Sequence, residues 1–141
     1  MYVDSAYVAK YYVNETDAAA VRKLIQNASY VCTSAWAVAE VTCVFHRHVR
    51  EGFLSLEQGR ELMDLFRSHS DKGLWSLIPV SDGLLKRTAT LVRSLPSVVP
   101  LRAGDAIHLA TALDAGEQEM WTNDRHLLAA ATHVGLVGRT V

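Results

Sequence analysis

The chain has few of the features that mark secreted, membrane or disulfide-rich proteins. Its 141 residues include only two cysteines, Cys32 and Cys43, which form no C-x-x-C pair. We therefore expect small buried thiols in a reducing compartment. No charged-then-apolar signal peptide opens the chain, and no apolar run is long enough to cross a bilayer. These absences predict a soluble, cytoplasmic protein with no membrane partner.

Positive charge is also scarce. The net charge is −1 at pH 7, which argues against a protein that binds nucleic acids or other polyanions tightly and without specificity. A local basic rim, or an enzyme that binds an anionic substrate briefly, is still compatible with that charge. Half of the residues are hydrophobic, enough for a sizeable core, and no repeat, low-complexity tract or linker interrupts them. The sequence therefore predicts a single domain over residues 1–141.

Several familiar catalytic motifs are missing. There is no glycine-rich phosphate loop, no G-x-S-x-G, and no legible Ser-His-Asp or Cys-His constellation. His46 and His48 are two residues apart on an expected helix, so they face different sides and cannot share a metal ion. His108 and His126 each follow an acidic residue closely enough to touch a substrate, but a structural or solvated role is favoured for both.

The hydrophobic pattern alternates between strands and helices. We expect short strands at residues 1–3, 30–33, 75–80, 119–122 and 134–137. We expect seven helices. Their expected ranges are 6–13, capped by Ser5; a second helix that starts at 14 or 16; 34 to about 50, capped by Ser34; 55–73; a fifth helix that starts at 81 or 82; 104–115; and 125–131. Strands separated by helices imply right-handed crossovers, hence an α/β fold with a mostly parallel sheet of about five strands.

Four acidic residues stand out because of their surroundings: Asp4, Glu40, Asp105 and Asp124. Asp4 and Asp124 each follow an expected strand, so both point to the carboxyl edge of the sheet, where such folds bind ligands. Asp105 lies in the first turn of its helix, where the dipole favours negative charge. Glu40 lies about two turns into an otherwise apolar helix and would reach the same edge by facing inward.

Each acid also has a structural explanation. Asp4 and Asp124 are ordinary helix caps, and Asp105 is a favourable first-turn acid. Glu40 is harder to explain, because an ion pair with Arg47 would be out of register for i,i+4. If the fold does gather all four, two carboxylates ~4 Å apart repel by roughly 4 kcal/mol at an effective dielectric of 20. Such a cluster must bind cations or hold protons at raised pKa.

The chemistry of the donors narrows the choice of ligand. Oxygen-only ligation selects Mg²⁺ or Mn²⁺ over zinc. Basic residues expected near this edge are Lys10, Arg102 and Arg125. They are either phosphate contacts for a polynucleotide or solvated surface charges.

Taken in order, these motifs resemble those of the PIN-domain ribonucleases, and most closely the VapC toxins of toxin–antitoxin pairs. The resemblance rests on Val3-Asp4-Ser5-Ala6, Ala39-Glu40-Val41, Gly104-Asp105-Ala106-Ile107-His108-Leu109-Ala110 and Thr122-Asn123-Asp124. No single motif is specific, but four in this order across nearly the whole chain are strong support.

The resemblance implies a PIN-like three-layer fold and a metal-dependent endoribonuclease. The four acids would hold one or two Mg²⁺ or Mn²⁺ ions, and Ser5 and Thr122 would orient carboxylates. The family's usual targets are tRNA or rRNA. The resemblance also implies a homodimer and a cognate antitoxin, for which apolar residues around Gly52-Phe53-Leu54-Ser55-Leu56, at the tip of a helical hairpin, would make a docking patch unless they pack in the core.

Three alternatives compete with this interpretation. A haloacid-dehalogenase-like phosphatase needs a second acid two residues after the first, where this chain has Ala6. A receiver domain needs adjacent acids near the first strand and a late lysine, yet no lysine follows Lys86. A catalytically silent RNA-binding or protein-interaction module with the same fold is the alternative from another class, although it would have no need of four repelling acids.

Overall fold

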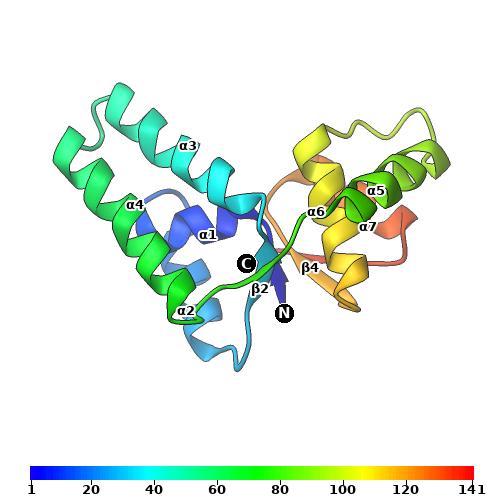
Figure 1. Ribbon diagram of the computed structural model, residues 1–141, viewed down its shortest axis with the longest axis horizontal. Coiled ribbons are helices and arrows are strands. Elements are labelled where there is room, and N and C mark those ends of the chain that lie inside the picture. The colour runs from blue at the N-terminus through cyan, green and yellow to red at the C-terminus, as the bar shows by residue number, and fades with distance from the viewer.

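Five short strands form one parallel sheet in the computed structural model. The structure describes residues 1–141 (Figure 1). The strands are β1 (Tyr2–Val3), β2 (Cys32–Ser34), β3 (Ser76–Ile78), β4 (Glu119–Trp121) and β5 (Val137–Arg139). The helices are α1 (Ser5–Tyr12), α2 (Ala18–Asn27), α3 (Ala37–Arg50), α4 (Leu56–Asp71), α5 (Asp82–Ser94), α6 (Ala103–Asp114) and α7 (Arg125–His133).

The strand order in the sheet is β3-β2-β1-β4-β5, and every neighbouring pair is parallel. The chain adds β2 and β3 on one side of β1 and then crosses to the other side for β4 and β5. The order therefore reverses between β1 and β4, and this is the switch point at which open α/β sheets bind ligands. Asp4 follows β1 and Asp124 follows β4 by three residues, so both lie beside the switch point.

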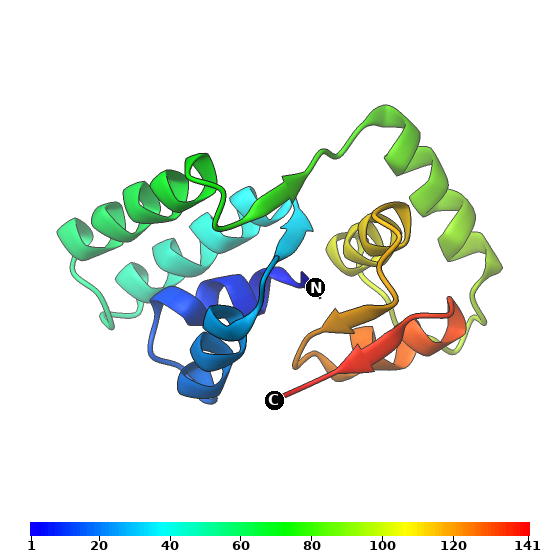
Figure 2. The same cartoon turned by 90° about the horizontal axis from the view of Figure 1, so that it is seen from below.

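Helices cover both faces of the sheet. The ribbon views show α1 to α4 grouped on one side and α5 to α7 on the other (Figures 1 and 2). Tyr2 and Val3, neighbours on β1, point to opposite faces, as successive strand residues must. Val3 belongs to the core cluster with α1 to α4, and Tyr2 to the cluster with α6 and α7. The expected three-layer α/β fold with a parallel sheet of five strands is confirmed.

Several local expectations are wrong, each for a physical reason. Ser34 stays in β2 and accepts a hydrogen bond from the Trp36 backbone, so α3 begins only at Ala37 and Glu40 lies in its first turn rather than the second. The cap of α1 is Asp4, not Ser5. The last strand starts three residues later than expected, because α7 continues to His133.

One of the two cysteines also differs from expectation. Cys32 is buried in the sheet, but Cys43 is exposed. The buried residues of α3 are Ala37, Val41, Phe45 and His48, and Cys43 lies off the face that they form. No helix in the structure is both long and apolar enough to span a membrane.

Candidate active site

Asp4 is the most deeply buried of the four acids, with 4% of its surface exposed. Its carboxylate caps α1 by accepting a hydrogen bond from the Tyr7 backbone at 2.9 Å, and it accepts a second from the Thr122 hydroxyl. Burial raises the pKa of Asp4, the bonds from Thr122 and Tyr7 lower it, and the negative charge of Glu40 raises it further; the net pKa is raised. A charge on Asp4 therefore lowers the stability of the folded state.

Thr122 connects two of the acids. Its hydroxyl donates to Asp4 and accepts a hydrogen bond from the Asp124 backbone at 2.9 Å. A hydroxyl can donate one hydrogen bond while accepting others, so threonine suits this bridging position. The contact fixes the end of β4 relative to the start of α1.

Glu40 is held from two sides. Its Oε2 accepts hydrogen bonds from the Ser5 hydroxyl and from Nε2 of His108, the latter at 2.9 Å. Burial raises the pKa of Glu40, the hydrogen bonds from His108 and Ser5 are among the influences that lower it, and its net pKa is lowered. Glu40 is therefore a stable anion at the edge of the sheet, in contrast to Asp4.

The other carboxylate oxygen of Glu40 lies against the start of α6. A Cβ built on Gly104 would stand 2.5 Å from Oε1 of Glu40 and 3.3 Å from Nε1 of Trp36. Only glycine leaves room for the carboxylate here, because a heavy-atom approach of 2.5 Å is far inside ordinary van der Waals contact. Gly104 immediately precedes Asp105, so this close approach brings two of the four acids to the same place.

Asp105 and Asp124 are less buried than Asp4. One oxygen of Asp105 accepts from the Arg102 backbone at 3.3 Å, and one oxygen of Asp124 caps α7 by accepting from the backbones of His126 and Leu127. Burial raises the pKa of Asp105, the Arg102 bond lowers it, and the negative charge of Asp124 raises it; the net pKa is raised. Each of these two carboxylates keeps its second oxygen free of hydrogen bonds within the protein.

The four acids are thus brought to one edge and influence one another through their charges. Glu40 acts on Asp4 and on Asp105, and Asp124 acts on Asp105. No group of three or more His, Cys, Asp or Glu side chains is close enough to hold a metal ion jointly. The donors nevertheless suit a hard divalent cation, because all four are carboxylates and Asp105 and Asp124 each keep one oxygen free of hydrogen bonds.

The basic residues expected near this edge fall into two groups. Arg102 and Arg125 are exposed and take part in none of the ion pairs of the structure. Arg102 lies three residues before Asp105, and Arg125 directly follows Asp124. Lys10 lies in the second turn of α1 and is only 9% exposed. Its burial leaves little of the side chain for contact with a phosphate.

Sequence reasoning missed the part that Tyr2 and His108 play. His108 is 2% exposed, and it bonds to Glu40 through one ring nitrogen and to the Tyr2 hydroxyl through the other. The available signal was a histidine one turn after Asp105, in a helix segment that otherwise consists of Ala, Ile, Leu and one Thr. His126, by contrast, is half exposed and lies 3.9 Å from Asp124.

The family model for the PIN domain matches residues 1–132 of this chain. The chain belongs to the PIN-domain family. A solved structure similar to this PIN domain is that of VapC20 from Mycobacterium tuberculosis, a toxin that cleaves the sarcin–ricin loop. The two share 14% sequence identity with a TM-score of 0.73, over 92% of this chain and 93% of VapC20. At this identity the likeness establishes a shared fold. No curated protein sequence matches significantly.

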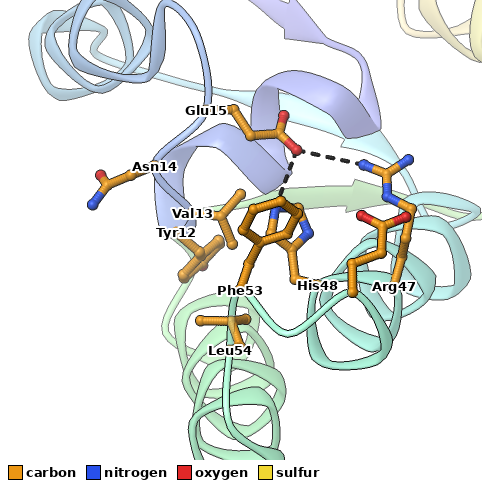
Figure 3. Close-up of a pocket in the computed structure, with 9 residues that line it drawn as sticks. Tyr12, Val13, Asn14, Glu15, Arg47, His48, Phe53 and Leu54 are labelled. Carbon is orange, nitrogen blue, oxygen red and sulfur yellow. Dashed lines mark hydrogen bonds and ion pairs between the residues drawn. The ribbon is translucent and has the colours of Figure 1, made fainter.

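A separate hollow of about 520 Å³ lies away from the acids of this PIN domain, where the loop after α1 meets the end of α3 (Figure 3). Glu15 pairs there with Arg47 at 3.4 Å and with His48 at 3.3 Å. Phe53, at the tip of the α3–α4 hairpin, lies beside the His48 ring and is 72% exposed. The hollow is therefore lined both by the ion-paired side chains of Glu15, Arg47 and His48 and by the apolar side chain of Phe53.

Proposed function

We propose that this PIN domain, a single domain over residues 1–141, is a metal-dependent endoribonuclease. The observation that carries the proposal is that Asp4, Glu40, Asp105 and Asp124, from four separate segments, lie along one edge beside the switch point of a parallel sheet, where their charges act on one another. Two of them, Asp4 and Asp105, have raised pKa values, the electrostatic signature of carboxylates assembled for a function other than stability.

The four acids would hold Mg²⁺ or Mn²⁺, and PIN domains generally use divalent metal ions. A bound ion supplies Lewis acidity and an activated water for attack on a phosphodiester. Ser5 orients Glu40 and Thr122 orients Asp4 through hydrogen bonds. Arg102 and Arg125 hold the backbone phosphates of the RNA beside the acids, while Lys10, largely buried, contributes less.

The test is cleavage of a total small-RNA and rRNA pool by the purified protein, with Mg²⁺, with Mn²⁺ and with EDTA. We expect discrete fragments that need metal and disappear in Asp105→Asn. Asp114→Asn is the matched control, because Asp114 lies at the other end of α6 and pairs with Arg87 at the surface. Cleavage that survives EDTA or Asp105→Asn would contradict the proposal.

We infer further that the protein is the toxin of a VapBC-type pair that acts on tRNA or rRNA. The fold it shares with VapC20 supports this class of substrate. The hairpin tip supports a protein partner, because Phe53 and Leu56 are 72% and 59% exposed. An antitoxin segment with apolar side chains would cover them, beside the hollow of Glu15 and Arg47. Capture of the protein by its antitoxin should weaken in Phe53→Ser but not in the exposed control Val98→Ser.

A homodimer belongs to the same proposal. Leu85 and Val92 on α5 are nearly half exposed, and apolar residues of this kind form the centre of subunit interfaces. Light scattering on the purified protein should give twice the 15.5 kDa mass of one chain. A mass of one chain at micromolar concentration would remove the dimer from the proposal.

One observation favours a second candidate, a catalytically silent PIN-like module that binds RNA or protein. No three of the candidate ligands converge closely enough to hold an ion. RNA binding that is indifferent to Mn²⁺, together with no cleavage of any RNA in the pool, would favour this candidate over the nuclease.

A further inference from the structure

A chain of buried hydrogen bonds runs from Tyr2 through His108 to Glu40. The Tyr2 hydroxyl lies 2.8 Å from Nδ1 of His108, and Nε2 of the same ring lies 2.9 Å from Oε2 of Glu40. Tyr2 is fully buried and His108 is 2% exposed, so neither side chain faces bulk solvent. The chain spans from the first strand to α6 and ends on a carboxylate at the edge of the sheet.

The direction of these bonds follows from the chemistry of Tyr2. A tyrosine hydroxyl has an ordinary pKa of about 10, so the Tyr2 hydroxyl carries its proton at neutral pH. If this O–H donates to Nδ1 of His108, the ring proton must reside on Nε2, which faces Glu40. Tyr2 therefore selects the tautomer in which His108 donates to the carboxylate.

The two bonds to Glu40 have a geometric consequence. Both the Ser5 hydroxyl and His108 act on Oε2, and they fix the rotation of the carboxylate about its last bond. Oε1 is then the carboxylate oxygen left for a cation, and it lies against Gly104, the residue before Asp105. Ser5 alone would be a single flexible contact, because a hydroxyl rotates freely whereas a buried imidazole ring does not.

We propose that His108 is a positioning residue, which Tyr2 holds in the donating tautomer so that Glu40 presents Oε1 to the divalent cation. The inference rests on the proposed metal-dependent function of the same site. A histidine with only a packing role in this core could be replaced by an apolar residue of similar size without effect on the affinity for a cation. The proposal requires the opposite.

The first test compares His108→Gln with His108→Leu, and measures Mn²⁺ affinity from the electron paramagnetic resonance of free Mn²⁺ rather than from activity. The Gln amide can place an N–H donor near the position of Nε2, whereas Leu cannot donate. We expect His108→Leu to lose about 10- to 100-fold in Mn²⁺ affinity, the usual effect of removing a group that orients a ligand, and His108→Gln to retain most of it.

His46→Leu and His46→Gln serve as controls, because His46 is exposed on α3. Thermal unfolding of each protein without metal establishes that it is folded. Equal Mn²⁺ affinity in folded His108→Leu and wild type would overturn the proposal, and so would equal losses in the Leu and Gln variants.

The second test places Tyr2 in the same pathway. Tyr2→Phe removes the hydroxyl and frees the histidine to take either tautomer, so we expect a smaller loss of Mn²⁺ affinity than in His108→Leu. In the His108→Leu background, Tyr2→Phe should have no further effect on affinity, because Tyr2 acts only through His108. Additive losses would show that Tyr2 acts independently and would overturn the pathway.

The two proposals fail in distinguishable ways. If wild type binds Mn²⁺ and cleaves RNA but the His108 variants bind Mn²⁺ equally well, the positioning role is wrong and the nuclease proposal stands. If wild type neither binds Mn²⁺ nor cleaves RNA, the nuclease proposal is wrong, and the positioning role is overturned with it.

Discussion

Asp4 experiences two opposing influences, because burial disfavours its charge while hydrogen bonds from Thr122 and Tyr7 favour it. Burial is the larger influence, so the folded-state pKa lies above its ordinary value of 3.8. The cost of the charge is therefore absent below pH 3.8 and is fully present once the pH exceeds the folded-state pKa. At neutral pH the protein without metal should be less stable than it would be with a neutral group at this position.

We accordingly predict that Asp4→Asn stabilises the metal-free protein at pH 7. A gain of about 4 °C in melting temperature would correspond to ~1 kcal/mol in a domain of this size. The gain should disappear as the pH falls below 3.8, where Asp4 is also neutral. Calorimetry across this pH range checks both statements. RNA cleavage should be lost in the same variant.

Asp4→Ala separates the capping role from the charge. Asparagine caps helices about as well as aspartate, whereas alanine loses ~1 kcal/mol. The Ala variant should therefore be less stable than the Asn variant at every pH. If Asp4→Asn is itself destabilising at pH 7, the hydrogen bonds of the charged carboxylate outweigh its burial.

Glu40 should behave with the opposite sign. Burial raises the pKa of Glu40, but polar contacts that include the hydrogen bonds from His108 and Ser5 lower it, and the net pKa is lowered. Its charge therefore stabilises the fold above the ordinary value of 4.5, and that stability is lost as the pH falls through the folded-state pKa. Glu40→Gln should cost ~1 kcal/mol at pH 7, and the cost should shrink in acid. Urea unfolding at pH 7 and pH 3.5 checks this; a cost that is the same at both would exclude the charge as its source.

Single residues also show how far the roles of the site residues could be predicted from the sequence. Asp4 and Asp124 were each open to two interpretations, as helix cap and as site residue. In the structure Asp4 and Asp124 are both helix caps, and both also lie at the edge of the sheet where the site was expected. The structural role favoured for His108 agrees with its burial, but its partners Tyr2 and Glu40 could not be predicted, because the sequence gives no hint of which carboxylate lies across from this histidine.

At the scale of elements, the start of α6 controls how Glu40 and Asp105 meet. We predict that Gly104→Ala lowers RNA cleavage by at least tenfold, because the new Cβ would stand 2.5 Å from Oε1 of Glu40 and displace the carboxylate. The loss of stability should be smaller than the loss of activity, since the end of one side chain can move aside.

Gly83→Ala is the matched control for that variant. Gly83 is likewise the second residue of its helix, but a Cβ there meets nothing closer than the end of the Arg87 side chain at 3.3 Å. Alanine should stabilise the protein by ~0.4–1 kcal/mol through the unfolded chain and leave cleavage unchanged. Equal cleavage by both variants would mean that the close approach at Gly104 has no role in the site.

The order of the elements was readable from the sequence, but their boundaries depended on tertiary contacts. All five strands and seven helices occur in the expected order. The start of α3 moved because Ser34 pairs with β3 as part of the sheet, an interaction between segments more than 40 residues apart. A local pattern has no information about such a partner.

For the whole molecule, the repulsion among the four acids is the quantity that a cation would relieve. We predict that Mn²⁺ raises the melting temperature and that EDTA reverses the rise, because a ligand that binds only the native state stabilises it. At 100 times the dissociation constant the gain would be ~2.7 kcal/mol. Differential scanning fluorimetry, in separate titrations with Ca²⁺ and Mn²⁺, measures this rise in melting temperature.

The same titration in Asp105→Asn provides the comparison. This variant should start from a higher melting temperature without metal, because one raised-pKa carboxylate has become neutral, and should gain less from Mn²⁺. If Mn²⁺ leaves the wild-type melting temperature unchanged, the carboxylates do not form a metal site.

The sequence by itself determined the class of the fold, the order of its elements, the PIN-domain resemblance and the four acids, because hydrophobic periodicity, capping residues and short motifs are local properties of the chain. The tertiary structure decided what those acids contact. It placed Thr122 between Asp4 and Asp124, His108 and Tyr2 behind Glu40, and Gly104 against the Glu40 carboxylate. These contacts join segments as much as 118 residues apart. The direction of each pKa shift follows from them, because burial and hydrogen bonding arise only when the chain is folded.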